Sequence, residues 1–263
     1  MELNKLELLR GGTIHINDWF ELHQPTIEEI MNFGVSDFYS TAWTLCSSPW
    51  DMPSMLADLG IDFLKISEWE FFQILLSIID SSHLQPFIGD VDFKEFKPMT
   101  EHFKDGNERI VLFRESDEVI FDEKDYDIFI SYLREMIGFQ HKNKSKPSKT
   151  AAKWIIEDDR KQRSRAAKKG DKENESMIYD IVLSLVNTEE FSYDYETVFQ
   201  ITLYQLMKSF TQIQGKKSAV ALLQGSMSGF VDTKGISSLD MQWTYSDDKY
   251  KPRGKKLFND KSK

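Results

Sequence analysis

The sequence is poor in the residues that build disulfides and metal centres. It contains one cysteine, Cys46, and five histidines in 263 residues. A single cysteine excludes an intramolecular disulfide and any multi-cysteine metal site. Cys46 belongs to an apolar run that begins at Ala42, so we expect a buried structural thiol rather than a reactive one.

Long hydrophobic runs are also missing. The longest, Phe71–Ile79, is interrupted by Gln73 and Ser77, and it is far shorter than the roughly 20 residues that span a bilayer. The first residues, MELNKLELLRGG, lack the basic-then-apolar order of a signal peptide. We therefore expect a protein that works in a cytoplasm without membrane contact.

Catalytic and phosphate-binding motifs are absent as well. Gly11-Gly12 lacks the downstream Lys and Ser or Thr of a phosphate loop, and no two histidines have the i, i+4 spacing of a helical zinc site. Asp90 and Asp92 lack the further oxygen ligands that a calcium loop needs. The sequence thus predicts no catalytic residues, no cofactor and no metal, and we expect that the protein is not an enzyme.

The chain does have enough apolar material for a folded core. Hydrophobic residues make up 40% of it and aromatic residues 13%, which excludes global disorder. At this length the chain can hold one large domain or two small ones. Its net charge of -10 favours solubility and argues against nucleic-acid binding by the whole surface.

Positive charge is concentrated in one segment. From His141 to Lys172 there are 12 Lys and Arg against 4 Asp and Glu. We expect a helix that is capped by Thr150, docks through an apolar cluster at 151–156 and is exposed beyond it. A solvated helix or an arm for an acidic protein partner is favoured, and nucleic acid is the less favoured alternative because Trp154 alone could stack on a base. The basic patch comprises Arg160, Lys161, Arg163, Arg165, Lys168 and Lys169.

Short strand and helix patterns fill the first 140 residues. Alternation around Gly11-Gly12 predicts a β-hairpin over Leu6–Ile16. Ser67 and Glu70 form the capping-box pattern that opens a core helix. Further helices are expected at 25–34, 37–45, 54–59 and 123–136, and a small antiparallel sheet from segments at 87–93, 109–113 and 118–121.

The longest helical pattern runs from Phe191 to Phe230, after a predicted core helix at 177–186. Apolar residues recur every three or four positions on both sides of Gly215, which predicts an antiparallel hairpin of two helices. The stretch has more aromatic and methionine residues than one core face needs, which favours a partner-binding surface, although core filling is the competing interpretation. The candidate partner-binding residues are Phe199, Tyr204, Met207, Phe210, Met227 and Phe230.

These patterns predict a mainly α fold with a small antiparallel β-sheet, in the α+β class. We expect an α+β domain with an N-terminal hairpin and short helices at 1–140, followed by a basic linker and helix at 141–172. A C-terminal helical domain at 173–246 and a disordered tail at 247–263 complete the predicted organisation.

Two blocks of the sequence resemble a known protein class. One is INDWFELHQPTIEEIMNFG at 16–34, with its Gln-Pro-Thr helix entry, and the other is 185–243, with the lead-in Asn187–Phe191 and the ending that runs from Gly225 to Trp243. Together with the basic helix between them, they resemble tail assembly chaperones of tailed bacteriophages that infect Gram-positive bacteria. Members of this class are encoded beside the tape-measure gene and act by binding.

The resemblance implies a function in the host cytoplasm. Tape-measure proteins are mostly long amphipathic helix, and the chaperone would keep that chain soluble, and could recruit tail-tube subunits, until the tail polymerises. Assembly of the protein into a homo-oligomer is an open alternative. One alternative is a structural or connector protein that is retained in the virion tail, and a second is a nucleic-acid-binding protein that uses the basic helix at 142–172.

Overall fold

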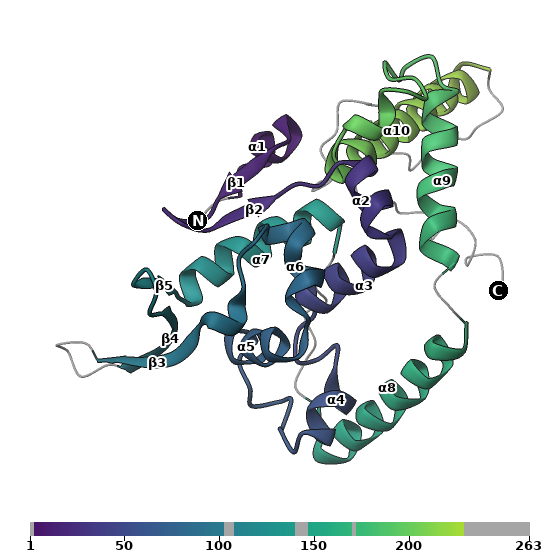
Figure 1. Ribbon diagram of the computed structural model, residues 1–263. Coiled ribbons are helices and arrows are strands. Elements are labelled where there is room, and N and C mark those ends of the chain that lie inside the picture. The colour runs from purple at the N-terminus through teal and green to yellow at the C-terminus, as the bar shows by residue number, and fades with distance from the viewer. Residues whose placement is uncertain (1–2, 103–107, 140–146, 170–171, 229–263) are drawn as a thin grey trace.

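The structure is a computed structural model that describes residues 3–102, 108–139, 147–169 and 172–228 (Figure 1). Its helices and strands confirm a mainly α fold with small antiparallel sheets. The elements, in chain order, are α1 (Lys5–Arg10), β1 (Thr13–His15), β2 (Glu21–His23), α2 (Ile27–Phe33), α3 (Val35–Cys46), α4 (Pro53–Asp58), α5 (Glu68–Ile78), α6 (Ser81–Ile88), β3 (Lys97–His102), β4 (Glu108–Arg114), β5 (Val119–Phe121), α7 (Glu123–Ile137), α8 (Lys149–Lys169), α9 (Lys172–Val186) and α10 (Leu203–Met227).

Local capping signals start several of these helices. Thr26, Ser67 and Asp122 each accept a hydrogen bond from the backbone N–H three residues on, and an acidic side chain there bonds back to the cap. The capping box expected at Ser67 is therefore confirmed. Gly138 ends α7 in the left-handed conformation, at φ 75°, which a residue without Cβ adopts at low cost.

The predicted hairpin over Leu6–Ile16 with its turn at Gly11-Gly12 is wrong, and a different N-terminal hairpin is present, which turns between His15 and Glu21. Strands β1 and β2 pair antiparallel, with Ile14 opposite Leu22. The expected first strand is instead α1, in which Leu8 is fully buried and Leu6 is 74% exposed. Residues two apart on a helix point to nearly opposite sides. An alternation as short as this one therefore does not distinguish a strand from a helical turn.

The three-stranded sheet also begins at a different segment. Its order is β3-β4-β5, and its register places Lys97 opposite Phe113. The prediction of strand structure at 87–93 is wrong, because Phe87 lies in the last turn of α6 and Phe93 starts a short 3-10 helix. Both rings are buried in the core, and a short apolar run at a buried helix end looks the same in sequence as a short strand.

The C-terminal stretch forms one long helix. Residues Leu203–Met227 are continuous in α10, so the predicted two-helix hairpin with a turn at Gly215 is wrong. An interior glycine costs a helix only about 1 kcal/mol, which other contacts of a long helix offset. Residues 195–202, predicted to share the helical face, instead form a turn and a short 3-10 helix ahead of α10.

One core joins the two ends of the described chain. Its buried side chains come from α1, the hairpin, α2, α3, α5–α7, β4, β5, α9, α10 and the segments that join them. The start of α2 meets the start of α10 through a bridge between Thr26 and Thr202, and the Ile27 N–H donates to the Ile201 carbonyl at 3.0 Å. The domain boundaries stay predictions, and the predicted tail at 247–263 lies outside the described residues.

A second, smaller cluster anchors α8. Its buried residues are Leu56, Phe63, Phe71 and Leu75, and half-buried apolar residues at 152, 155 and 156 of α8 pack against them. Docking of this helix by its start is therefore confirmed. The helix begins two residues earlier than expected, however, and the Ala151 N–H donates to Ser148 Oγ, so Thr150 is not its cap. In Figure 1, α8 runs from α4 toward α9 along one edge of the molecule.

Candidate functional site

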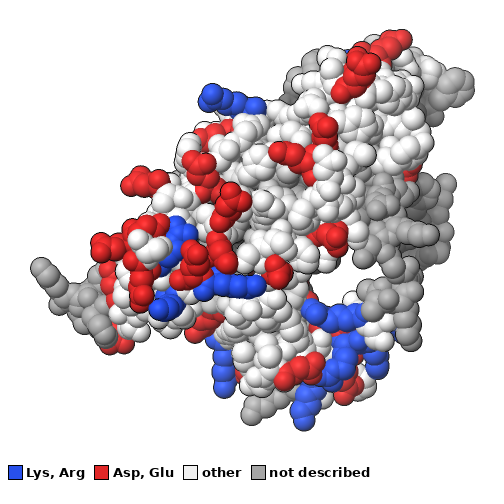
Figure 2. Space-filling view, viewed as in Figure 1, with Lys and Arg blue, Asp and Glu red and all other residues white. Residues whose placement is uncertain are grey.

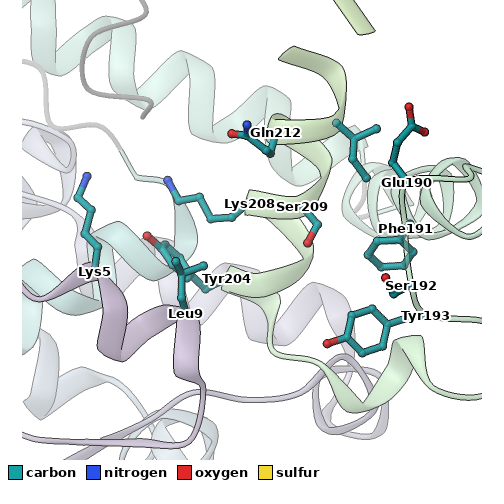
Figure 3. Close-up of a pocket in the computed structure, with 11 residues that line it drawn as sticks. Lys5, Leu9, Glu190, Phe191, Ser192, Tyr193, Tyr204, Lys208, Ser209 and Gln212 are labelled. Carbon is teal, nitrogen blue, oxygen red and sulfur yellow. The ribbon is translucent and has the colours of Figure 1, made fainter. Parts of the chain in front are cut away.

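A groove lies between α1, the segment 190–193 and α10 (Figure 3). We call it the α1–α10 groove. Its volume is about 560 Å³, which lies within the range of protein ligand sites. Its lining is Lys5, Leu9, Glu190, Phe191, Ser192, Tyr193, Tyr204, Lys208, Ser209, Gln212 and Ile213.

The floor of the groove is one stripe of α10. Tyr204, Lys208 and Gln212 are four residues apart, so they lie above one another on the same helix face. The helix start is fixed by a capping pair, because Gln205 Oε1 accepts from the Thr202 N–H at 2.9 Å and Thr202 Oγ1 accepts from the Gln205 N–H at 3.3 Å. The stripe therefore begins at a well-defined position beside the core.

The first wall is the end of α1. The Gln205 side-chain amide donates to the Leu9 carbonyl at 2.8 Å, which ties α1 to the start of α10. Gly11 follows at φ 76°, where a Cβ would lie 3.2 Å from Gln205, so a glycine allows this close approach. Leu9 is held beside the groove with 46% of its surface exposed.

The second wall is the loop that joins α9 to α10. Phe191 and Tyr193 have ring centroids 5.3 Å apart, and Phe191 packs against the main core. The loop is braced by Asp194, whose carboxylate accepts from the Thr197 hydroxyl at 2.7 Å and from its N–H at 2.9 Å. These bonds to Thr197 lower the pKa of Asp194, since they favour the ionised carboxylate.

The two ends of the groove carry different clusters of charged groups. The ammonium groups of Lys5 and Lys208 lie 3.5 and 3.2 Å from the same carboxylate oxygen of Glu135 on α7, and the Tyr204 hydroxyl donates to that oxygen at 3.1 Å. Glu190 lies on the other side of α10, 3.9 Å from Lys217. Figure 3 shows the two lysines on one side of the helix and Glu190 with the aromatic wall on the other.

The predicted partner-binding residues are divided among different environments. Tyr204 is 2% exposed and forms part of the groove floor. Phe199, Met207 and Phe210 are half-buried against the main core, whereas Met227 is 87% exposed at the end of α10. Phe230 lies outside the described residues. As a partner-binding set, these residues remain a prediction.

The groove includes accessible apolar residues that the sequence did not single out. Phe191 and Tyr193 belong to the stretch identified from its periodicity, but they precede the helix, so a periodic pattern does not select them. Leu9 belongs to α1, near the first described residue, whereas α10 is the last described helix, so the two are far apart in sequence. Only the Gly11-Gly12 pair after it marks that end of the chain for close packing.

The predicted basic patch on α8 is partly neutralised. Arg160 forms an ion pair with Asp58, and Arg163 lies 3.1 Å from Asp159. Lys161 and Arg165 are exposed, and the side chains of Lys168 and Lys169 are outside the described part. In Figure 2, Lys and Arg side chains over α8 are interleaved with Asp and Glu, so this helix is mixed in charge rather than uniformly basic.

Metal and thiol chemistry find little support in the described chain. No three His, Cys, Asp or Glu residues in the described ranges are grouped to hold a metal ion. Cys46 is buried as predicted, and burial raises the pKa of its thiol to about 12, so it is protonated at neutral pH. Nor does any described helix combine the length and apolar character that a membrane crossing requires.

One comparison connects the C-terminal part of the chain with a known family. Residues 168–246 match the family model of the YomV second domain, a Bacillus phage-type protein family. The matched segment includes α9 and α10, and therefore the floor and aromatic wall of the groove, whereas α1 lies outside it. No curated protein and no solved structure matches the chain.

Proposed function

We propose that this protein is a phage tail assembly chaperone that binds the tape-measure protein and keeps it soluble in the host cytoplasm. The α1–α10 groove is the observation that carries the proposal. Most of the surface area that lines the groove is apolar, although several lining residues are polar or charged. The segment that matches the phage-type family supplies the floor and one wall. Tail-tube subunits would be a second partner, and the protein would act by binding rather than by catalysis.

Helix-in-groove recognition supplies the physical mechanism. A long amphipathic helix exposes an apolar stripe before it assembles, and such a stripe causes aggregation. A groove between helices covers the stripe with anchors spaced at i, i+3, i+4 and i+7. Leu9, Tyr193 and Ile213 provide apolar contacts on both walls and the floor, and the first two are accessible to a partner.

Co-expression tests the proposal directly. The tape-measure protein encoded by the same phage would be produced with and without this protein, and its soluble fraction measured. We expect a large gain in soluble protein with the wild-type chain. Leu9→Asp should abolish the gain, because it places a charge in the groove, whereas Leu6→Asp should retain it. Both residues are exposed leucines of α1, but Leu6 is not part of the groove lining.

Two results would contradict the proposal. One is an unchanged soluble fraction of the tape-measure protein when the folded wild-type chain is present. The other is stoichiometric retention of this protein in purified mature particles, measured by mass spectrometry, which would support a connector in the finished tail. Circular dichroism of both leucine variants would establish that each remains folded.

A further inference from the structure

We infer that the α1–α10 groove selects an acidic amphipathic helix, and that Lys5 and Lys208 recognise a carboxylate beside the apolar stripe of that helix. The inference rests on the proposed function, because it assigns the chemistry of the partner that the same groove takes. It goes further in predicting which charge the partner carries and at which end of the groove.

The two lysines converge from separate elements. Lys5 belongs to α1 and Lys208 to α10, yet both ammonium groups lie within 4 Å of one oxygen of Glu135. Each ammonium group has three N–H donors and can serve more than one acceptor. A carboxylate that enters this end of the groove would therefore meet two ammonium groups beside the single Glu135 carboxylate, a net positive charge of one that the fold has already brought together.

The lysine end is also preorganised. Lys208 lies over the Tyr204 ring, 5.1 Å from its centroid, and the Tyr204 hydroxyl is held by Glu135. The lysine side chains are 37% and 28% exposed, so both charges are partly shielded from water and salt. Less side-chain entropy is lost on binding when the charged groups are already held in place.

The rest of the molecule makes this charge pair distinctive. The chain has a net charge of -10, which repels an acidic helix in general. Glu190, on the other side of α10, lies 3.9 Å from Lys217, so that end of the groove pairs one carboxylate with one ammonium group rather than two ammonium groups with one carboxylate. The two ends would thus set the direction in which a bound helix lies, since charge complementarity fixes register and suppresses wrong partners.

A peptide titration with the full-length protein tests the inference. The probe is a synthetic amphipathic helix of about 15 residues, with leucines at i, i+3, i+4 and i+7, two glutamates at one end and two lysines at the other. A second peptide replaces the glutamates by glutamine. Each is titrated by fluorescence anisotropy against the wild type, the Lys5→Gln/Lys208→Gln variant and the Lys94→Gln/Lys97→Gln control. The control lysines also lie close to carboxylates, but they are outside the groove.

We expect the glutamate peptide to bind the wild type about fivefold more tightly than the glutamine peptide, as for two partly exposed ion pairs. This preference should disappear in the Lys5→Gln/Lys208→Gln variant and persist in the control. The preference should also shrink as salt is raised, because the ion pairs are partly screened.

Distinct outcomes separate failure of this inference from failure of the proposed function. If both peptides bind the wild type equally and co-expression still solubilises the tape-measure protein, the carboxylate preference is wrong and the chaperone function stands. If neither peptide binds, or if sedimentation shows a dimer that Tyr193→Asp dissociates, the groove does not take an acidic helix and this inference is overturned. If the wild-type chain fails to keep the tape-measure protein soluble in co-expression, the proposed function itself is contradicted.

Discussion

The two long helices α8 and α10 are held to the body in different ways. Helix α10, of 25 residues, starts inside the main core, where Leu203, Tyr204 and Leu206 are each at most 2% exposed. Helix α8, of 21 residues, contributes only half-buried apolar side chains to the smaller cluster. Hydrophobic burial therefore anchors α10 more strongly than α8.

Polar contacts provide much of the attachment of α8. Helix α4 has Met52 at its N-cap position, and no side chain there bonds to the helix. Asp159 of α8 takes that role from a distance, because its carboxylate accepts from the Ser54 N–H at 3.0 Å and from the Ser54 hydroxyl at 2.5 Å. Helix α10 is thus part of the main core, and we expect α8 to behave as a docked arm that detaches locally.

The largest expected effect comes from truncating the buried start of α10. Leu206→Ala should lower the free energy of unfolding by about 2–5 kcal/mol, through lost burial and the cavity left behind. Leu223→Ala, in the same helix but 38% exposed, is the matched control and should change it by less than about 1 kcal/mol. Urea denaturation followed by circular dichroism measures both. If both substitutions lowered the free energy of unfolding equally, the buried start and the exposed later part of α10 would not differ in their contribution to stability.

A smaller and more local effect should follow from removing the clip between α8 and α4. Asp159→Ala should cost about 1–2 kcal/mol, because it leaves Ser54 and the first turn of α4 without their acceptor. Asp158→Ala is the control, since the neighbouring Asp158 carboxylate accepts from Gln162 of the same helix. Thermal unfolding of the two variants provides the comparison.

Thiol labelling shows where the Asp159→Ala effect is felt. Cys46 is buried, with a pKa raised to about 12, so it should be labelled at pH 8 only when the main core opens. A cysteine introduced by Ala152→Cys lies on the face of α8 that packs against the smaller cluster, and it should be labelled faster than Cys46, and faster still when combined with Asp159→Ala. Identical labelling rates for the two thiols would contradict local detachment of α8.

The smallest effect is expected at the exposed aromatic residue of α8. Trp154 is 66% exposed and contributes little burial, so Trp154→Ala should change the free energy of unfolding by less than about 0.5 kcal/mol. The same variant tests the nucleic-acid alternative. If filter binding to single-stranded DNA is steeply salt-dependent and is lost in this variant, α8 would be a nucleic-acid interface rather than a simple docked arm.

Much of the secondary structure was predictable from local sequence. The capping box at Ser67 and the helix end at Gly138 involve residues three or four apart, so their bonds can be inferred without the fold. The sequence predictions are wrong where local patterns are ambiguous: the alternation of Leu6 and Leu8 predicts a strand where α1 lies, and Gly215 predicts a break inside the continuous α10. In both places tertiary packing overrides a weak local preference.

The candidate site was predictable only in part. The periodicity of 191–230 pointed to the floor of the groove, and Tyr204 does lie there. The wall from α1 and the charge cluster around Glu135 were not accessible to sequence reasoning, because they bring together the first helix, α7 and α10. No spacing rule relates residues so far apart in a chain.

The sequence by itself determined that this is a mainly α protein with a core, one isolated thiol and an aromatic-rich C-terminal stretch. Composition and short-range capping decide these properties, since they depend on residue types and on neighbours within one helical turn. Only the tertiary structure decided that α10 is one helix, that α1 faces it across a groove, and that Lys5 and Lys208 share one carboxylate. These features depend on burial and on long-range contacts, which form only when distant segments pack together.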